Sequence, residues 1–106
     1  MYVDKKIALM YLANSEDIFQ KIKKSFCNSY RDASNMLHNA FKEKNYEELY
    51  RIVHSIKGIS LNLGSEVLYH DSSDLCLEFK KEIYNIQHIE EFIDTLNNVI
   101  IELERL

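Results

Sequence analysis

The chain contains no proline and only two glycines among its 106 residues. These two residue types mark most turns, so their scarcity leaves very little turn punctuation along the sequence. No segment shows the sustained alternation of apolar and polar residues that a half-buried strand requires. An all-helical fold is therefore the natural inference.

Cysteine is also scarce, and long apolar runs are absent. Cys27 and Cys76 are not arranged as C-x-x-C and form no disulfide framework, so a reduced protein with two core thiols is the simpler interpretation. No run approaches the roughly 20 apolar residues of a membrane span, and no basic region followed by an apolar one begins the chain. We expect a soluble, cytoplasmic protein.

Basic residues are not in excess either. The chain carries 13 Lys and Arg against 17 Asp and Glu, a net charge of −4, so it lacks the basic stripe that nucleic-acid binding requires. The length suits a single domain, residues 1–106. The 46% of hydrophobic residues are enough to form a core without help from disulfides or a metal.

What the sequence does contain is helical periodicity. Apolar residues recur every three or four positions, which predicts one short helix and four long ones. The expected ranges are 3–12, 16–44, 46–63, 65–84 and 87–105. Asn14-Ser15 and Ser65 are the expected caps, and Gly64 is an expected left-handed helix end. Ile83 is expected to face inward. The predicted architecture is all-α, an antiparallel four-helix bundle with the short N-terminal helix capping one end.

The helix expected over residues 46–63 places a histidine away from the core. Its apolar stripe is formed by Leu49, Ile52, Val53, Ile56, Ile59 and Leu63. At about 100° per residue, His54 lies roughly 160° from Ile56, the centre of that stripe. The same exposed half also contains Arg51, Lys57, Gly58 and Leu61. An exposed imidazole flanked by two cations suits an anion.

Gly58 is expected to destabilise its helix, because a glycine inside a helix lowers its stability by roughly 1 kcal/mol relative to alanine. Close packing against another helix would explain it, but Gly58 faces away from the predicted core. The missing side chain therefore clears space beside His54 for another protein's active site. Lys57 is either an ordinary surface lysine or a cation for the same site, and Arg51 carries the same ambiguity.

The pattern His54-x-x-Lys57-Gly58, followed by Gly64, resembles the motif of the histidine-containing phosphotransfer (HPt) domains of two-component phosphorelays. The motif lies in the middle of the second long helix of the predicted bundle, as it does in that family, and the resemblance extends over most of the chain. It implies that His54 is the phosphoacceptor. It also implies that Lys57 stabilises the phosphate charge and that Gly58 gives access to the backbone.

The resemblance implies a phosphoryl carrier that passes phosphate between receiver-domain aspartates in a multistep phosphorelay, through Nε2 of His54. A neutral imidazole, with an ordinary pKa of about 6.5, needs no neighbouring base for this attack. The magnesium ion that assists the reaction would belong to the receiver domain, so we expect no cofactor or metal in this chain. The two glycines form no ATP-binding motif, which argues against autonomous kinase activity.

The expected partner is the receiver domain of a response regulator or of a hybrid histidine kinase, and the chain is expected to be a monomer. Tyr50, Arg51 and Leu61 are the expected docking residues beside His54. Leu61 is either such an anchor or a surface residue of no consequence. The initiating Met1 favours a free-standing protein over one domain of a larger kinase.

Two other functions stay open. The chain could be the phosphoacceptor domain of a chemotaxis-type histidine kinase, which shares the motif and takes phosphate from an ATP-binding domain. It could also be a helical adaptor that uses its exposed face for docking without phosphate. A metal site at His70, Asp71 and Asp74 is disfavoured against a solvated helix face. His38 and His88 are expected surface residues.

Overall fold

The computed structural model describes all residues 1–106 and contains helices but no strand. Six α-helices and one 3₁₀ turn follow in the order α1 (Lys5–Tyr11), α2 (Glu16–Tyr30), α3 (Ala33–Lys42), α4 (Tyr46–Ser60), η1 (Leu61–Leu63), α5 (Glu66–Lys80) and α6 (Ile86–Glu104). The prediction of an all-helical fold is confirmed.

Short polar side chains begin most helices of this proline-free chain. A backbone N–H three residues later donates a hydrogen bond to each of four capping side chains, at 3.1 to 3.2 Å; the caps are Ser15, Asn45, Ser65 and Asn85. Such caps satisfy donors that the first turn of a helix leaves free. The expected caps at Ser15 and Ser65 are confirmed. Gly64 ends the preceding segment in the left-handed conformation, with φ of 80°, as predicted.

The single helix expected over residues 16–44 is wrong, because the chain breaks at Arg31 and Asp32 into α2 and α3. Asp32 leaves helical geometry, with φ of −101° and ψ of 18°. Its carboxylate accepts a hydrogen bond from the side-chain amide of Asn35 at 2.8 Å. Local hydrogen bonds of this kind compete with continuation of a helix. The break lets α2 pack against α6 and η1, while α3 packs against α4 and α6.

The helix expected to reach Tyr84 also ends early, since α5 stops at Lys80. Glu82 takes a left-handed conformation, with φ of 59°, and the N–H of Ile83 donates to the carbonyl of Glu78 at 2.9 Å. A left-handed residue followed by such a bond is a common way to end a helix. Ile83 therefore lies outside the helix and is 47% exposed, so its predicted inward position is wrong.

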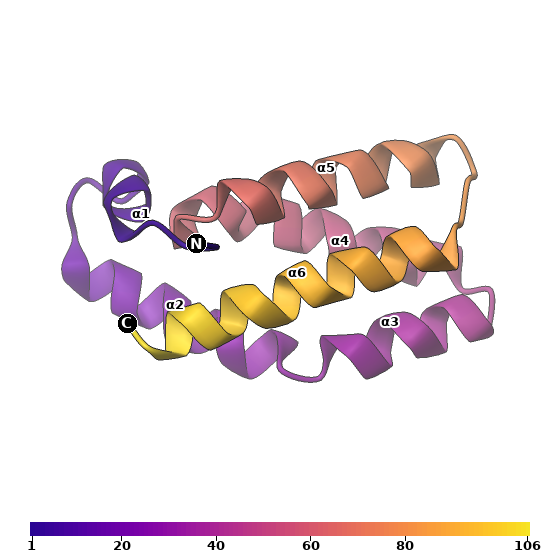
Figure 1. Cartoon of the computed structure of the whole chain (residues 1–106), viewed down its shortest axis with the longest axis horizontal. Helices are drawn as coiled ribbons and strands as arrows, with labels where there is room; N and C mark the ends of the chain where they lie inside the picture. The colour runs from indigo at the N-terminus through magenta and orange to yellow at the C-terminus, as the bar shows by residue number, and fades with distance from the viewer.

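The long helices lie side by side and alternate in direction (Figure 1). α2 and α3 follow one another along the molecule, α4 returns, α5 runs out again, and α6 ends near the N-terminus. α4 packs against α5 and α3, α5 packs against α6, and α1 packs against η1 and α2. The molecule measures 40 × 23 × 21 Å. None of the helices combines the length and the apolar character that crossing a bilayer requires.

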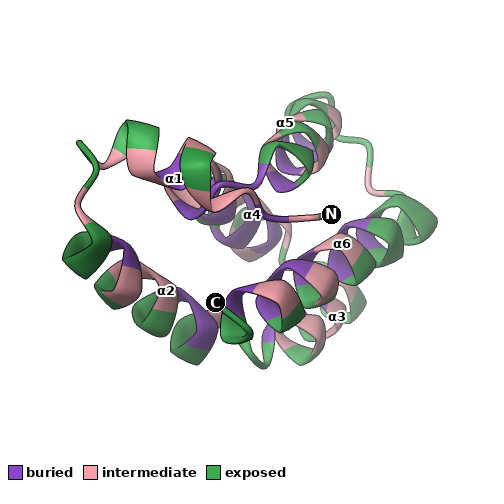
Figure 2. Ribbon diagram, turned by 60° about the vertical axis from the view of Figure 1, so that its left-hand side comes forward, coloured by how far each residue is buried: buried purple, intermediate pink, exposed green.

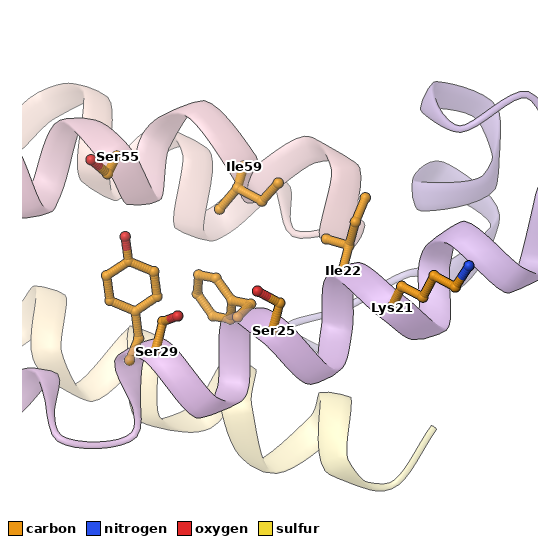
Figure 3. A pocket seen from close by; sticks show the side chains of 8 residues that line it. Lys21, Ile22, Ser25, Ser29, Ser55 and Ile59 are labelled. Carbon is orange, nitrogen blue, oxygen red and sulfur yellow. The ribbon is translucent and has the colours of Figure 1, made fainter.

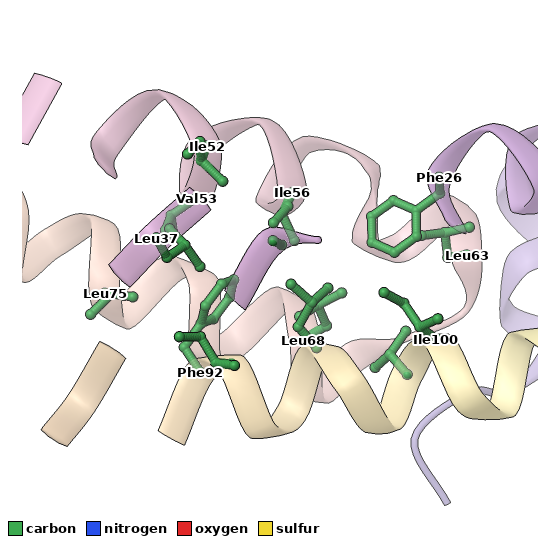
Figure 4. Packing of buried hydrophobic residues seen from close by; sticks show 14 of the residues in the cluster. Phe26, Leu37, Ile52, Val53, Ile56, Leu63, Leu68, Leu75, Phe92 and Ile100 are labelled. Atoms are coloured by element: carbon green, nitrogen blue, oxygen red, sulfur yellow. The ribbon is translucent and has the colours of Figure 1, made fainter. Parts of the chain in front are cut away.

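One core of 24 buried apolar residues fills the space between these helices (Figure 2, Figure 4). α4 contributes four side chains that are each no more than 1% exposed, namely Leu49, Ile52, Val53 and Ile56. The predicted stripe is confirmed, except that Ile59 lies half-buried at its edge. Cys27 and Cys76 are buried, unpaired thiols. Burial of the α4 stripe determines which face of that helix remains outside.

Candidate functional site

The face of α4 opposite the core carries His54, whose imidazole is exposed. Its placement away from the core is as predicted. The surrounding side chains are either exposed or half-buried at the edges of the same surface. We call this surface the His54 face, and it consists of Tyr50, Arg51, His54, Ser55, Lys57 and Gly58.

An open hollow of about 530 Å³ lies over the N-terminal half of the His54 face. It is lined by Asn45, Glu47, Glu48, Tyr50, Arg51, His54 and Ser55. The imidazole therefore shares one surface hollow with two carboxylates and a guanidinium.

The ring of Tyr50 stacks on the imidazole of His54, with ring centroids 5.4 Å apart and planes inclined by 23°. Side chains of a helix lean toward its N-terminus, so the side chain of His54 covers the turn that begins at Tyr50. Side-chain hydrogen bonds and ion pairs form at His38 and His88 but not at His54. Both imidazole nitrogens of His54 are thus available to an incoming group.

Gly58 lies one turn after His54 and is exposed. A Cβ atom placed on Gly58 would meet no atom within 4 Å. Close packing inside this chain therefore does not explain the glycine. A longer side chain at position 58 would lean back over His54, so glycine leaves the C-terminal side of the imidazole uncovered.

Arg51 is not a free cation. Its guanidinium holds the carboxylate of Glu48 at two points: Nε donates to Oε2 at 3.0 Å, and Nη2 donates to Oε1. The hydrogen bond from Arg51 lowers the pKa of Glu48, and the same contact raises the pKa of Arg51. This pair was not predicted from the sequence, although the three-residue spacing from Glu48 to Arg51 is a usual one for ion pairs on a helix.

Lys57 lies on the other flank of the His54 face, toward α5. Burial raises the pKa of the Cys76 thiol in α5, and the charge of Lys57 opposes that shift. The ion pairs of the structure do not include Lys57. Lys57 is therefore the cation of this face whose charge no carboxylate balances.

A groove of about 400 Å³ separates α2 from α4 next to the His54 face (Figure 3). Its apolar lining comes from Ile22, Phe26 and Tyr30 of α2 and from Ile59 of α4. Ser55, the neighbour of His54 in sequence, lines the same groove. The groove was not predicted from the sequence, because Ile59 was expected in the core. The available signal was the position of Ile59 at the edge of its stripe.

Leu61 lies just after the end of α4, beyond the residues that we group as the His54 face. α4 ends at Ser60, and Leu61 begins η1, where it is half-buried. The backbone of Leu61 is still close to α-helical, with φ of −71° and ψ of −31°. Leu61 is half-buried, as Tyr50 and Lys57 are, and its role as a docking residue stays a prediction.

Two of the other histidines make surface contacts with carboxylates. His88 Nδ1 lies 2.9 Å from the carboxylate of Glu78. The hydrogen bond with Glu78 raises the pKa of His88. His38 Nε2 lies 3.7 Å from the carboxylate of Glu90. These contacts join neighbouring helices and leave both rings at the surface.

The weaker metal candidate at His70, Asp71 and Asp74 does not form a cluster of ligands. Asp71 accepts a hydrogen bond from the hydroxyl of Thr95 at 2.7 Å. His70 and Asp74 are exposed. Nowhere in the structure do three or more His, Cys, Asp or Glu side chains come together in a way that could hold a metal ion.

Comparisons with protein-family models, with curated proteins and with solved structures found no match. The His54 face and the motif that it carries are therefore the basis for a functional assignment.

Proposed function

We propose that this chain is a histidine-containing phosphotransfer domain in which His54 carries a phosphoryl group between receiver-domain aspartates. The observation that carries the proposal is an exposed imidazole in the middle of α4, with no side chain at Gly58 to cover it. The architecture proposed with it is an antiparallel four-helix bundle. In that bundle α2 and α3 together form the first long helix, and α1 caps one end (Figure 1).

The transfer step needs an imidazole and an aspartyl phosphate. The lone pair of Nε2 attacks phosphorus, the bond between phosphorus and the aspartate oxygen breaks, and the carboxylate leaves with the electron pair. The Nδ1 proton stays on the ring, which is cationic until that proton passes to water. Neutral imidazole is abundant near pH 7, because its ordinary pKa is about 6.5. A second aspartate carboxylate then attacks phosphorus, Nδ1 takes a proton back from water, and the bond between phosphorus and Nε2 breaks, so that neutral His54 leaves with the electron pair.

Lys57 and Arg51 would act differently on the phosphoryl group. Lys57 has no carboxylate partner and offers its charge directly. Arg51 has to leave Glu48 first. A phosphoryl group carries close to two negative charges, which favours exchange of the guanidinium from one carboxylate to the phosphate. Lys57 is thus the proposed resting cation, and Arg51 is a cation recruited after transfer.

A receiver domain must bring its aspartate to His54, so the surface around the imidazole is the proposed docking surface. Tyr50 and Arg51 border His54 in the hollow, and the apolar groove between α2 and α4 begins beside it at Ser55. Apolar area next to a polar rim is the usual composition of a protein interface. The α2 side of the groove, lined by Ile22, Phe26 and Tyr30, is the proposed main apolar contact, and Leu61 stays a predicted second one.

The test is transfer of radioactive phosphate from a panel of receiver domains that are phosphorylated on aspartate. His54→Gln is the variant. His70→Gln, which removes an exposed histidine of α5, is the matched control. The proposal predicts label in the wild type and in His70→Gln but not in His54→Gln. The label should be lost in acid and should survive in alkali.

Two results would contradict the proposal. Transfer from an isolated kinase ATP-binding domain, but from no receiver, would identify the phosphoacceptor domain of a chemotaxis-type kinase. Binding of a receiver that His54→Gln leaves intact, without label from either donor, would identify a helical adaptor.

A further inference from the structure

The aromatic ring that packs against the imidazole of His54 belongs to Tyr50. The two ring centroids are 5.4 Å apart and the planes are inclined by 23°. Tyr50 is half-buried and packs against the core cluster, whereas His54 is exposed. The stack therefore connects an exposed reactive ring to a ring that the bundle holds in place.

An exposed histidine without such a support samples several side-chain rotamers. Attack on phosphorus requires a near-attack geometry, with the reacting atoms about 3 to 3.5 Å apart and aligned. No side-chain hydrogen bond orients the imidazole of His54, in contrast to the rings of His38 and His88. Tyr50 is the contact that remains to orient it.

Tyr50, His54 and Gly58 follow one another along α4 at intervals of one helical turn. Tyr50 covers the N-terminal side of the imidazole, and Gly58 leaves the C-terminal side open. We propose that Tyr50 is a positioning residue that restricts rotation of the imidazole, so that Nε2 keeps one orientation toward an incoming phosphoryl group while the ring face on the Gly58 side stays uncovered. This inference rests on the proposed phosphotransfer function, and it gives Tyr50 a role that is separate from docking.

The proposed role belongs to the ring of Tyr50 and not to its hydroxyl, because stacking depends on the aromatic face. Tyr50→Phe keeps the face and should behave as the wild type. Tyr50→Leu keeps apolar volume at the half-buried site but removes the flat surface. Tyr11→Leu is the matched control, since Tyr11 is a 57% exposed tyrosine of α1.

The experiment measures the rate at which phosphoramidate phosphorylates His54. Nε2 attacks phosphorus, the bond between phosphorus and nitrogen breaks, and ammonia leaves with the electron pair. This small donor has no docking surface, so a docking role of Tyr50 does not affect the rate. We expect Tyr50→Leu to react about twofold to tenfold more slowly than the wild type. Tyr50→Phe and Tyr11→Leu should react at the wild-type rate.

A second readout is the side-chain NMR spectrum of His54 in the unphosphorylated protein. We expect one dominant rotamer and ring-current-shifted imidazole protons in the wild type and in Tyr50→Phe. Both features should be averaged in Tyr50→Leu. The thermal unfolding midpoint of each variant is measured alongside, and Tyr50→Met replaces Tyr50→Leu if the latter is unfolded.

Three results would overturn the positioning role of Tyr50. They are equal phosphoramidate rates for Tyr50→Leu and the wild type, a loss seen only with a receiver as donor, and an equal loss in Tyr50→Phe. A failure of the proposed function looks different. In that case the wild type itself takes no phosphate from phosphoramidate or from any receiver, while the NMR spectra still report whether Tyr50 orders the ring.

Discussion

The two glycines of this chain lie close together in sequence but in opposite surroundings. Gly58 is exposed, and a Cβ atom there would meet nothing within 4 Å. Gly64 is buried, has φ of +80°, and a Cβ atom there would lie 2.2 Å from the carbonyl oxygen of Asp4. The fold requires one glycine and does not require the other.

The turn at Gly64 attaches the N-terminal segment to the rest of the molecule. The N–H of Asp4 donates to the carbonyl of Gly64 at 2.8 Å. On the other side, the carboxylate of Glu102 in α6 accepts hydrogen bonds from the N–H groups of Tyr2 and Val3 at 2.8 to 3.0 Å. The hydrogen-bonding groups of this region are thus paired within the chain. The fold alone explains why Gly64 stands there, and no partner molecule is needed.

On the His54 face, by contrast, contacts within the chain do not explain the glycine. Gly58 lowers helix propensity and gains no internal contact in return, and Lys57 has no carboxylate partner. A residue that costs stability without an internal reason points to something outside the chain. One motif, from His54 to Gly64, therefore contains a glycine that the fold needs and a glycine that we assign to access to His54.

The largest expected effect is loss of stability in Gly64→Ala. The left-handed backbone and the contact with the Asp4 carbonyl together should lower the free energy of unfolding by about 2 to 5 kcal/mol. Urea denaturation of the variant measures this loss. An unchanged urea midpoint would contradict this expectation, because Gly64 would then be as dispensable for folding as Gly58.

The second effect separates stability from function at Gly58. Gly58→Ala should raise the free energy of unfolding by up to about 1 kcal/mol, because alanine favours a helix and the added Cβ meets nothing. Gly58→Leu should slow transfer from a receiver by about tenfold or more, since its side chain leans over His54. Denaturation curves and transfer rates are measured on both variants. A destabilised Gly58→Ala would show that the glycine serves the fold after all.

A smaller effect is expected at Glu48. Glu48→Gln releases the guanidinium of Arg51, which should favour the phosphorylated state of His54 by a few-fold. The phosphotransfer equilibrium with a receiver measures this shift. The control is Asp17→Asn, which breaks the ion pair between Asp17 and Lys21 on α2. It should leave the phosphotransfer equilibrium unchanged. A shift toward the receiver would show that Arg51 does not engage the phosphate.

The smallest effect is a pH dependence of stability at His88. Its pKa is raised above the ordinary value of 6.5 by the hydrogen bond with Glu78. The stabilisation is therefore fully present below pH 6.5 and is lost as the pH rises through the raised pKa. Because the pair is exposed, only a slight decrease in thermal midpoint is expected over that window, and Glu78→Gln should abolish it. An unchanged profile in Glu78→Gln would show that the contact between His88 and Glu78 is not its source.

Burial decided most of what could be predicted from the sequence. The stripe at Leu49, Ile52, Val53 and Ile56 packs inward, so the outward position of His54 and Gly58 followed from helical geometry alone. Prediction failed where local hydrogen bonds compete with periodicity, at Asp32 between α2 and α3 and at the left-handed Glu82 after α5.

The remaining features of the candidate site depend on contacts that periodicity does not report. The pairing of Arg51 with Glu48 is a choice among the several conformations of a long side chain. The apolar groove depends on how far α2 stands from α4, which places Tyr30 and Ile59 on its walls instead of in the core. Distances between helices follow from the packing of the whole core and not from either stripe alone.

The most direct test of the central claim is to locate the phosphate on the protein after incubation with a phosphorylated receiver, by mass spectrometry at neutral pH. The chain has four histidines, and the other three, His38, His70 and His88, serve as internal controls because each is at least partly accessible. We predict a single phosphoryl group on the segment that contains His54. Phosphate on another histidine would contradict the assignment of His54 as the phosphoacceptor. The assignment would also fail if this protein takes no phosphate from a receiver that does pass its phosphate to a known phosphotransfer domain.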